Sequence, residues 1–323
     1  MTQIRRLGPR DVPPALGLLQ EAYARQRELC PDLPETIMCD PSLAAAAIEG
    51  AVARGAVGAM VSGALVGFMG VSAEFRFKGQ RAVLMNELSH AAASRDAHAL
   101  YGALYEALGS SAPLTTSRLH IVAHLAGEEA VAARLHSLGF GQFLAEEIRG
   151  LGEVPAGRAA YRVERLTDME RLVDLETEHR RYYRQSPIYL HKDDSPDSVR
   201  ADLEEWAGPD TAVFIHAEDD APLGYFAVSS CKGLEEGRLL RNTNSAQVLS
   251  AYVTDVARGK GAGRALLGRC VTWARERGFQ RIMVEHETAN LLGSAFWARH
   301  FRPYLSFVMR YAEVDAPAEE DRA

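Results

Sequence analysis

The most chemically informative part of the chain is a run of glycines and basic residues between a strand-like and a helix-like segment. Residues 247–253 have the composition of a β-strand, and residues 264–277 place apolar side chains at helical spacing. Glycines allow a backbone to approach a ligand closely, and the first N–H groups of a helix attract anions. The connection therefore predicts an anion-binding turn. The residues that would surround the anion are Arg258, Gly259, Lys260, Gly261, Ala262, Gly263 and Arg264.

The spacing of these glycines does not match two common phosphate loops. A P-loop requires Ser or Thr after its lysine, whereas Gly261 follows Lys260 here. A dinucleotide loop requires G-x-G-x-x-G, whereas the chain has G-x-G-x-G followed by Arg264. A nucleotide-binding enzyme is therefore disfavoured, and it stays an alternative that competition between CoA and ATP would test.

The segment instead resembles the acyl-CoA loop of the GCN5-related N-acetyltransferase (GNAT) superfamily, [RQ]-G-x-G-x-[GA], at every specified position. Residues 290–302 are similar to the closing motif of the same family, N-x-x-A-x-x-F-Y-x-x-x-G-F. Asn290 and Phe296 match this motif, whereas Trp297 stands at the tyrosine position. The glycine of the final Gly-Phe pair is missing before Phe301.

The resemblance implies an N-acetyltransferase that uses acetyl-CoA as co-substrate. The acceptor would be an amine of a small molecule or peptide, attacking the thioester directly in a ternary complex. A backbone N–H near Tyr252 and Val253 would stabilise the oxyanion that develops. The residues implied to contact CoA are Tyr252, Val253, Arg258, Gly259, Lys260, Gly261, Ala262, Gly263, Arg264, Asn290 and Trp297.

The general base is not given by either motif. A primary amine with a pKa near 10.4 is protonated at pH 7, so a proton must be removed before attack. Many relatives carry Glu on the strand before the loop, where this chain has Ser250. On the next strand-like run, alternation places Glu285 and Glu287 on one face and His286 on the other. We predict the two carboxylates as candidate bases, with a chain of water molecules as the alternative.

The proton donor for the leaving thiolate is also open. Relatives often use the closing-motif tyrosine, but an indole such as that of Trp297 does not readily give up a proton. Tyr252 and Tyr304 are the candidate substitutes, and packing in the core is the alternative for each. A thiolate near pKa 8.5 can leave without an acid. The alternative to an enzyme is a tandem GNAT protein that binds acyl-CoA or a partner with little or no turnover.

An internal repeat predicts two domains. Residues 221–230 (APLGYFAVSS) repeat residues 64–73 (ALVGFMGVSA) 157 positions later, and Asp168 follows Asp11 at the same distance. Each Asp precedes helical apolar spacing, so each is predicted to cap a first helix. The predicted organisation is a first domain over residues 1–150, a Gly/Pro/Ala-rich linker over 151–160, a second domain over 161–313 and an acidic disordered tail over 314–323.

The first domain has the outline of the fold without the loop. A strand is predicted over residues 83–91, and the following residues 92–96 contain no glycine and include Asp96, which would repel a diphosphate. A strand over 119–124 and the sequence Leu138-Gly139-Phe140 resemble later elements of the family. The predicted fold class is α/β (α+β mixed sheet), with two tandem GNAT-type domains of which the first does not bind CoA.

Composition limits the function further. The chain has 323 residues, 47% of them hydrophobic and 24% charged, with a formal net charge of -7, which is typical of a soluble globular protein and argues against nucleic-acid binding. Residues 55–73 carry no charge, but Ser62-Gly63 at their centre predicts a β-hairpin and not a membrane span.

The remaining expectations concern location, metals and partners. The first residues contain no apolar leader, and the four cysteines form no C-x-x-C pair, so we expect free thiols in the cytoplasm. The histidines form no H-E-x-x-H frame, so we predict no metal. We expect no membrane partner, and a homodimer is left open.

Overall fold

The computed structural model describes residues 2–154, 161–206, 208–218, 221–231, 238–240 and 243–314. It forms two compact units. The first comprises Met1–Ala145 and Pro303–Ala323 with a short piece at Glu235–Leu239, and the second comprises Glu146–Leu234 and Leu240–Arg302. The chain's last strand is thus counted with the first unit, and the boundaries at 1–150 and 161–313 stay a prediction. Residues 155–160 of the predicted linker and 315–323 of the predicted tail lie outside the described residues.

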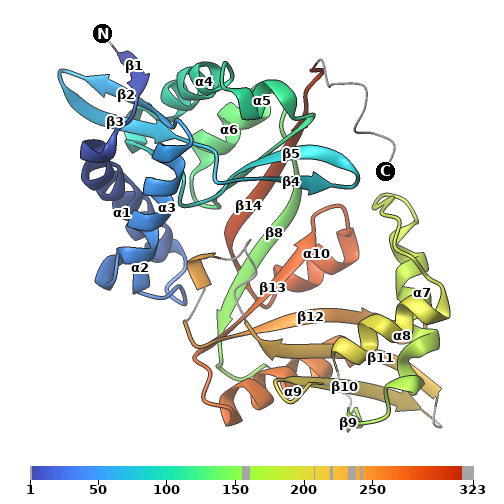
Figure 1. Cartoon of the computed structure of the whole chain (residues 1–323). Helices are drawn as coiled ribbons and strands as arrows, with labels where there is room; N and C mark the ends of the chain where they lie inside the picture. Colours follow the sequence, from blue (N-terminus) through green and yellow to red (C-terminus); the bar gives the residue numbers. More distant parts are fainter. Residues whose placement is uncertain are drawn as a thin grey trace. The chain divides into compact units, whose positions relative to one another are not determined.

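The first unit contains a small antiparallel sheet in the order β1-β2-β3-β6 (Figure 1). Its strands are β1 (Gln3–Arg6), β2 (Val57–Val61), β3 (Ala64–Met69) and β6 (His90–Ala92). The predicted hairpin is confirmed, because β2 and β3 pair on either side of Ser62-Gly63, which have the positive φ angles of a tight hairpin turn. Helices α1 (Val12–Leu29) and α4 (Ala97–Leu108) both pack against β3.

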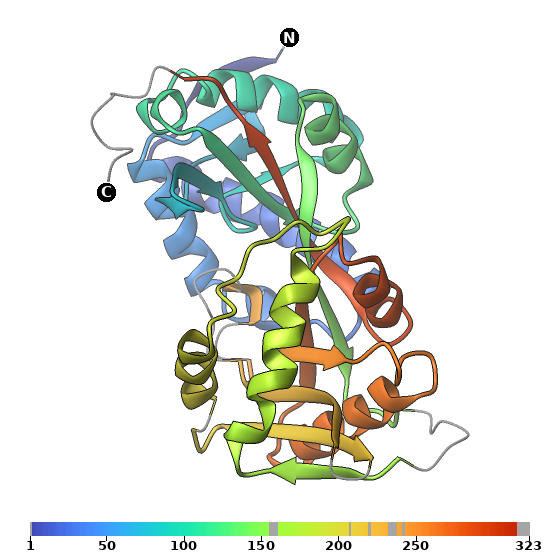
Figure 2. The ribbon, with the colours of Figure 1, turned by 90° about the vertical axis from the view of Figure 1, so that its right-hand side faces the viewer.

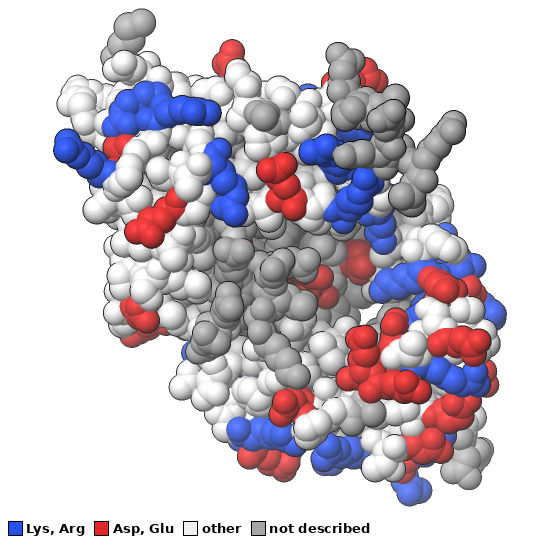
Figure 3. Space-filling view, in the orientation of Figure 1, with Lys and Arg blue, Asp and Glu red and all other residues white. Residues whose placement is uncertain are grey.

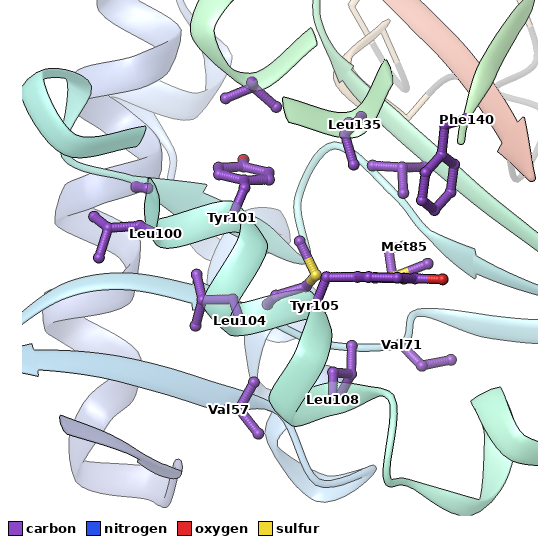
Figure 4. Close-up of a cluster of buried hydrophobic side chains, with 14 of the residues drawn as sticks. Val57, Val71, Met85, Leu100, Tyr101, Leu104, Tyr105, Leu108, Leu135 and Phe140 are labelled. Atoms are coloured by element: carbon purple, nitrogen blue, oxygen red, sulfur yellow. The ribbon is translucent and has the colours of Figure 1, made fainter. Parts of the chain in front are cut away.

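A second sheet in the first unit has the order β4-β5-β7-β14. Its strands are β4 (Ala73–Phe77), β5 (Gln80–Met85), β7 (Leu119–Leu125) and β14 (Arg302–Tyr311). The remaining helices of the unit are α2 (Thr36–Cys39), α3 (Ser42–Ala53), α5 (Ala112–Thr116) and α6 (Glu129–Ser137). Apolar side chains of α4 meet those of the strands and α6 in one core. Figure 4 shows among them Met85, Leu100, Tyr101, Leu104, Tyr105, Leu108, Leu135 and Phe140.

The strand predicted over 83–91 is wrong in one respect, because residues 86–89 divide it into β5 and β6. The Ser89 N–H and the Ser89 hydroxyl both donate to the Asn86 carbonyl, at 2.9 Å each, which closes a turn between the two strands. β5 then pairs with β7 in parallel, whereas β6 pairs with β3. The composition of the run indicated a strand, but the change of pairing partner is set by the tertiary fold.

His90 fills the space that this break leaves. Its Nε2 lies 2.9 Å from the Ala123 carbonyl on β7, and its Nδ1 lies 2.7 Å from the Tyr101 hydroxyl. A carbonyl only accepts, so Nε2 carries the proton and Nδ1 accepts from Tyr101. The neutral ring thus connects β6 to β7, two strands that are not neighbours in either sheet order. Burial lowers the pKa of His90 to about 4.

The second unit is built on the strand order β13-β12-β11-β10-β9. These strands are β9 (Val163–Leu166), β10 (Thr211–Glu218), β11 (Ala221–Ser230), β12 (Ser245–Val253) and β13 (Arg281–Glu287), with the end of β8 (Gly141–Gly150) beside β13. All pairs from β9 to β12 are antiparallel, and β12 pairs with β13 in parallel. The strands predicted over 247–253 and 280–286 are therefore confirmed, each within two residues at its ends.

Helices cover both faces of this sheet. The helices α7 (Val173–Tyr183) and α8 (Pro196–Glu205) enclose one apolar cluster, which includes Tyr225 and Tyr252. The helices α9 (Ala262–Glu276) and α10 (Leu291–Trp297) enclose a second cluster on the other face, with Phe226 and Trp297. Figure 2 shows α7 lying across the strands. Acidic side chains interleaved with arginines gather on the surface over α7 and α8 (Figure 3), where Arg200 pairs with Glu170 at 2.8 Å.

The predicted capping of the two first helices is corrected by the structure. Asp168 accepts from the Glu170 N–H at 3.1 Å, but this starts a 3₁₀ turn over Met169–Leu172 that precedes α7. Asp11 makes no cap bond to α1; its carboxylate accepts from the Gly8 N–H at 2.8 Å and pairs with Arg5. An Asp before a helical pattern has several amides within reach, and the chain's entry angle selects among them.

The two halves end their closing helices differently. In the first half, Phe140 N–H donates to the Leu135 carbonyl across Gly139, whose φ is 85°. In the second half, Phe301 N–H donates to the Trp297 carbonyl, one residue nearer, and no described residue between them has a positive φ. The missing glycine thus shortens the connection by one residue without disrupting the bond that ends the helix.

Three further observations complete the fold. All four cysteines are free thiols, as predicted, with Cys30 and Cys270 buried. Among the described residues, no helix combines the length and apolar character that crossing a bilayer requires. No group of three or more His, Cys, Asp or Glu side chains suited to a metal ion occurs in the same part of the chain.

We predict that the first unit loses stability as the pH falls from about 6.5 towards about 4. His90 is neutral in the folded state and takes up a proton on unfolding, so this residue contributes a loss of up to about 1.4 kcal/mol per pH unit in that window. Hydrogen exchange of peptides from β6 and β7 would measure it. In a His90→Gln variant the pH dependence should be weaker. An unchanged pH dependence of stability in this variant would contradict the role of His90. Tryptophan fluorescence would follow the second unit as a control, because the three tryptophans of the chain are Trp206, Trp273 and Trp297.

Candidate active site

The glycine-rich segment forms an open turn that leads into α9. Gly259 and Gly261 have φ angles of 73° and 113°, conformations that other residues adopt only with strain. Gly261 is the N-cap residue of α9, where it offers no side chain to bond the first amides. The Tyr161 hydroxyl donates to the Lys260 carbonyl at 2.5 Å and turns that oxygen away from the helix start. These features leave the turn with its N–H groups available.

The free N–H groups of the turn are consecutive. Ala257 and Arg258 donate to the Thr254 carbonyl, and Ala265 donates to the Gly261 carbonyl. Between them, no partner for the N–H groups of residues 259–264 occurs within the described ranges. Six free amides at the N-terminus of a 15-residue helix concentrate partial positive charge, to which the Arg264 side chain adds.

The counterpart turn in the first unit lacks this property. The Asp96 N–H donates to the Ala93 carbonyl, and the Ala97 N–H donates to the Ser94 carbonyl, so a 3₁₀ turn consumes the amides before α4. No residue of this turn has a positive φ. A bound anion would have to break these bonds and approach the Asp96 carboxylate.

Strands β12 and β13 separate beside the open turn. They pair only from Ser245 to Val248 on β12 and from Arg281 to Val284 on β13, although both continue further. The separation begins where β12 carries a bulge against β11, at Leu249. Beyond it, the Thr254 N–H bonds to Leu223 on β11, so alternation directs the N–H groups of Ala251 and Val253 towards the gap. The N–H group of Val253 is thus not used in pairing with β11 or β13.

A cavity of about 670 Å³ opens at this separation. It brings together predicted residues from the turn, both strands and α10. Those that line it are Tyr252, Val253, Arg258, Gly259, Gly261, Gly263, Arg264, Glu285, Glu287, Asn290 and Trp297. Lys260 and Ala262 belong to the turn without lining the cavity, and Tyr304 lies fully buried on β14 in the first unit. The roles assigned to all these residues stay predictions.

Aromatic rings and Arg258 form one wall of the cavity. The Arg258 guanidinium lies 4.7 Å from the ring centre of Tyr182 and 5.4 Å from that of Tyr252. The Tyr182 hydroxyl donates to Asn290 Oδ1 at 3.1 Å, and the Asn290 side chain also accepts from the Gly293 N–H and caps α10. Asn290, the first residue of the closing motif, therefore connects α7 to α10.

A buried polar cluster lies under β12 on the α7 side. The Tyr225 hydroxyl donates to Glu176 and lies 2.8 Å from Ser250 Oγ. His179 Nδ1 lies 3.1 Å from Glu176 Oε2 and 3.0 Å from the Tyr225 oxygen. Glu176, His179 and Tyr225 are each at most 5% exposed. Of the cluster, His179 reaches the cavity lining, and so does Ser250. Burial, then the Glu176 carboxylate, raises the pKa of Tyr225 well above its ordinary value.

Arg180 balances the charge of this cluster. It donates to Glu176 at 3.0 Å, to Asp202 at 2.6 Å and to the Asp193 carbonyl at 2.6 Å. Arg181 and Arg184 both pair with Asp194 instead. These three arginines are therefore engaged within the protein, and none of them lines the cavity.

The predicted bases and acids differ in their surroundings. Burial, followed by the negative charge of Glu287, raises the pKa of Tyr183 well above its ordinary value. His286, predicted to face away from Glu285 and Glu287, also reaches the cavity lining, and its Nε2 lies 3.2 Å from Glu147. Tyr252 donates to Glu178 at 2.9 Å, and burial together with this bond raises its pKa, so its hydroxyl is a weaker acid than a free phenol.

The sequence did not identify the cluster of Glu176, His179 and Tyr225. Glu176 and His179 are three residues apart, which places them on one helix face, but charged residues at that spacing are common on solvated helices. Tyr225 falls in the repeat APLGYFAVSS, at the position of Phe68 in the first half. The change from Phe to Tyr was the available signal, since a buried tyrosine needs a hydrogen-bond partner.

A family model matches part of the second half of the chain. The model of the acetyltransferase (GNAT) family matches residues 172–301, which contain the open turn, both separating strands and α10. None of the curated proteins matches the chain significantly.

Solved structures similar to this chain cover nearly its whole length, and the two with a TM-score of at least 0.50 show the fold. A GCN5-related N-acetyltransferase from Sphaerobacter thermophilus has 12% identity and a TM-score of 0.53, over 98% of this chain and 98% of that one. A fungal GCN5-related glucosamine N-acetyltransferase region has 11% identity and a TM-score of 0.50, over 96% of this chain and 38% of that one. A tandem GNAT protein from the clavulanic acid biosynthesis pathway has 14% identity and a TM-score of 0.43, over 99% and 100% of the two chains. The predicted fold class is confirmed.

We predict that Arg180→Met destabilises the second unit by about 3–5 kcal/mol, because it leaves the buried Glu176 carboxylate without its main countercharge. Urea unfolding followed by tryptophan fluorescence would measure the change. Arg200→Met is the matched control, since its pair with Glu170 is exposed and should contribute less than about 1 kcal/mol. Equal effects of the two substitutions would contradict the assignment of Arg180 as a buried countercharge.

Proposed function

Because residues 172–301 belong to the acetyltransferase (GNAT) family, within two tandem domains of that fold, we propose that this protein transfers the acetyl group of acetyl-CoA to a primary amine. The observation that carries the proposal is the row of six free amides at residues 259–264 beside the separation of β12 and β13. The amides suit a diphosphate, and the separation suits an extended chain that ends in a thioester.

The turn would hold CoA through charge and geometry. The diphosphate would accept from the backbone N–H groups of residues 259–264, with Arg258, Lys260 and Arg264 supplying positive charge. Arg299 and His300 also line the cavity, and burial followed by Arg149, Arg264 and Arg299 lowers the pKa of His300. The adjacent arginines that disfavour protonation of His300 would favour the phosphates.

The thioester would lie in the gap between the strands. Its carbonyl oxygen would accept from Val253 N–H, which is fixed by the pairing of β12 with β11 and needs no rearrangement as charge develops. The pairing of β12 with β13 ends at Val248, next to the bulge at Leu249. The N–H groups of Ala251 and Val253 therefore make no bond to β13 and remain free to bind the thioester carbonyl.

The acceptor would be a cationic amine. Glu285 and Glu287 line the cavity, and the arginines of α7 that could have favoured an acidic acceptor are paired within the protein. The Glu287 carboxylate lines the cavity together with Tyr183 and is suited to bind an ammonium group. We propose a small-molecule or peptide amine on this basis, and an enzyme of the cytoplasm in keeping with the free thiols.

The first domain would support the second without binding CoA. Its helix-start amides are consumed by a 3₁₀ turn, and the space between β6 and β7 is filled by His90. The strand register makes Ala92 the counterpart of Val253, because Gly67 and Gly224 of the repeat pair with these residues. His90 therefore stands where the second domain has Ala251, whose methyl group leaves the gap open.

We predict that Lys260→Glu and Arg264→Glu each weaken CoA binding at least about ten-fold, because they place a carboxylate beside the bound diphosphate. Isothermal titration with CoA at low salt would measure this, and Arg95→Glu, in the corresponding turn of the first unit, should have no effect. Substitution of Gly261 is avoided, since its φ of 113° and a Tyr161 contact at 3.2 Å would add strain. Unchanged affinity in both charge variants would remove the turn from the CoA site.

Catalysis is tested by release of CoA thiol from acetyl-CoA with a panel of primary alkylamines. An active transferase should release thiol in proportion to amine, and Glu287→Gln should raise KM for the amine about ten-fold without changing KM for acetyl-CoA. Binding of CoA without amine-dependent thiol release would instead identify an inactive acyl-CoA-binding protein. Displacement of CoA by ATP at equal concentration would favour a nucleotide site.

A further inference from the structure

Three imidazoles line the cavity, and their hydrogen bonds differ. His286 has Nε2 against Glu147 at 3.2 Å, and its Nδ1 lies 3.4 Å from both the Glu287 carbonyl and Ser294 Oγ. His300 lies among Arg149, Arg264 and Arg299, which oppose its protonation. His179 has Nδ1 bonded to Glu176, and no partner for its Nε2 occurs among the residues that the structure describes.

The hydrogen bonds of His179 fix its tautomer. Nδ1 faces the Glu176 carboxylate at 3.1 Å and the oxygen of Tyr225, whose own proton is directed to Glu176. An unprotonated Nδ1 would face only the lone pairs of the Glu176 carboxylate and of the Tyr225 oxygen. Nδ1 therefore carries the proton and donates it to Glu176. Nε2 of the neutral ring then holds a lone pair, which makes it a proton acceptor.

The ring lies beside the proposed thioester site. It stacks on Tyr252 with the ring centres 4.9 Å apart and the planes inclined by 28°. Tyr252 immediately precedes Val253 on β12, and all three residues line the same cavity. Ser250, two residues before Tyr252 on β12, also lines this cavity, and its Oγ bonds the Tyr225 hydroxyl. The cluster of Glu176, His179 and Tyr225 therefore reaches the cavity from the α7 side of β12.

We infer that His179 is the general base of the transferase, with Glu176 and Tyr225 as its positioning residues; this rests on the proposed function. The acceptor ammonium gives one proton to His179 Nε2, and the nitrogen lone pair then forms the bond to the thioester carbon. Collapse of the oxyanion breaks the C–S bond, and its electron pair leaves on sulfur. The second proton of the attacking nitrogen goes to that thiolate, and the imidazolium returns its proton to solvent.

The imidazolium that this step forms would lie against a carboxylate. On α7, Glu176 accepts from Nδ1, and Arg180 bonds the other carboxylate oxygen at 3.0 Å. Burial acts to raise the pKa of Glu176, but the bonds from His179, Tyr225 and Arg180 together lower it, so the carboxylate stays ionised. The other titratable groups that face the ring are Tyr183 of α7, Tyr225 of β11 and Tyr252 of β12, all with a raised pKa and therefore neutral.

The test compares His179→Gln and His179→Ala with the wild type, using acetyl-CoA and a primary alkylamine. We expect kcat/KM at pH 7 to fall by about 10²–10³ in both variants, with CoA affinity unchanged within two-fold. The deficit should shrink as the pH approaches the pKa of the amine, because the free amine then needs no base. Added imidazole should restore part of the activity of His179→Ala, which a purely structural role would not allow. His191→Gln, an exposed histidine outside the cavity, is the matched control and should retain full activity.

The outcomes separate this inference from the proposed function. If the wild type releases no thiol with any amine, the transferase proposal fails and the assignment of His179 fails with it. If the wild type is active and His179→Gln keeps its rate within three-fold and the same pH profile, the base assignment is overturned and the transferase proposal stands. Tryptophan fluorescence checks that each variant is folded. If His179→Ala unfolds, the pH profile of His179→Gln tests the base assignment, because glutamine can still donate to Glu176.

Discussion

The separation of two parallel strands is the constraint on which the rest of the second unit depends. β12 and β13 pair over four residues each and then diverge, so backbone donors that a continuous sheet would consume remain free. Unpaired N–H groups in a protein interior are costly unless a ligand or water satisfies them. The arrangement is therefore suited to a ligand that brings its own acceptors, and the open turn at residues 259–264 offers a second set of donors to the same molecule.

The first unit uses the corresponding backbone groups in bonds of its own. Its equivalent strand breaks at residues 86–89, and the His90 ring bonds the Ala123 carbonyl across the resulting space. The turn before α4 closes into a 3₁₀ helix that uses its own amides. Backbone groups to which we assign a ligand in the second unit are thus satisfied internally in the first.

The polar cluster under β12 joins a strand and a helix. β12 supplies Ser250, and α7 supplies the carboxylate of Glu176 and the imidazole of His179. Charge in this buried cluster is balanced by Arg180, which also holds α8 through Asp202. The ion pairs of Arg180 therefore both neutralise the cluster and hold the helix that positions the proposed base.

The sequence by itself determined the elements and the turn. Glycine spacing at 259–263, the alternation of 281–287 and the helical spacing after residue 262 are local properties, because backbone conformation depends mainly on neighbouring residues. The repeat likewise indicated two copies of one fold. Only the tertiary structure decided the break in β5–β6, the assignment of β14 to the first unit, the burial of Tyr304 and the meeting of Glu176 with Tyr225, 49 residues apart. These depend on which strand each segment pairs with and which side chains share a buried volume, and packing between distant segments sets both.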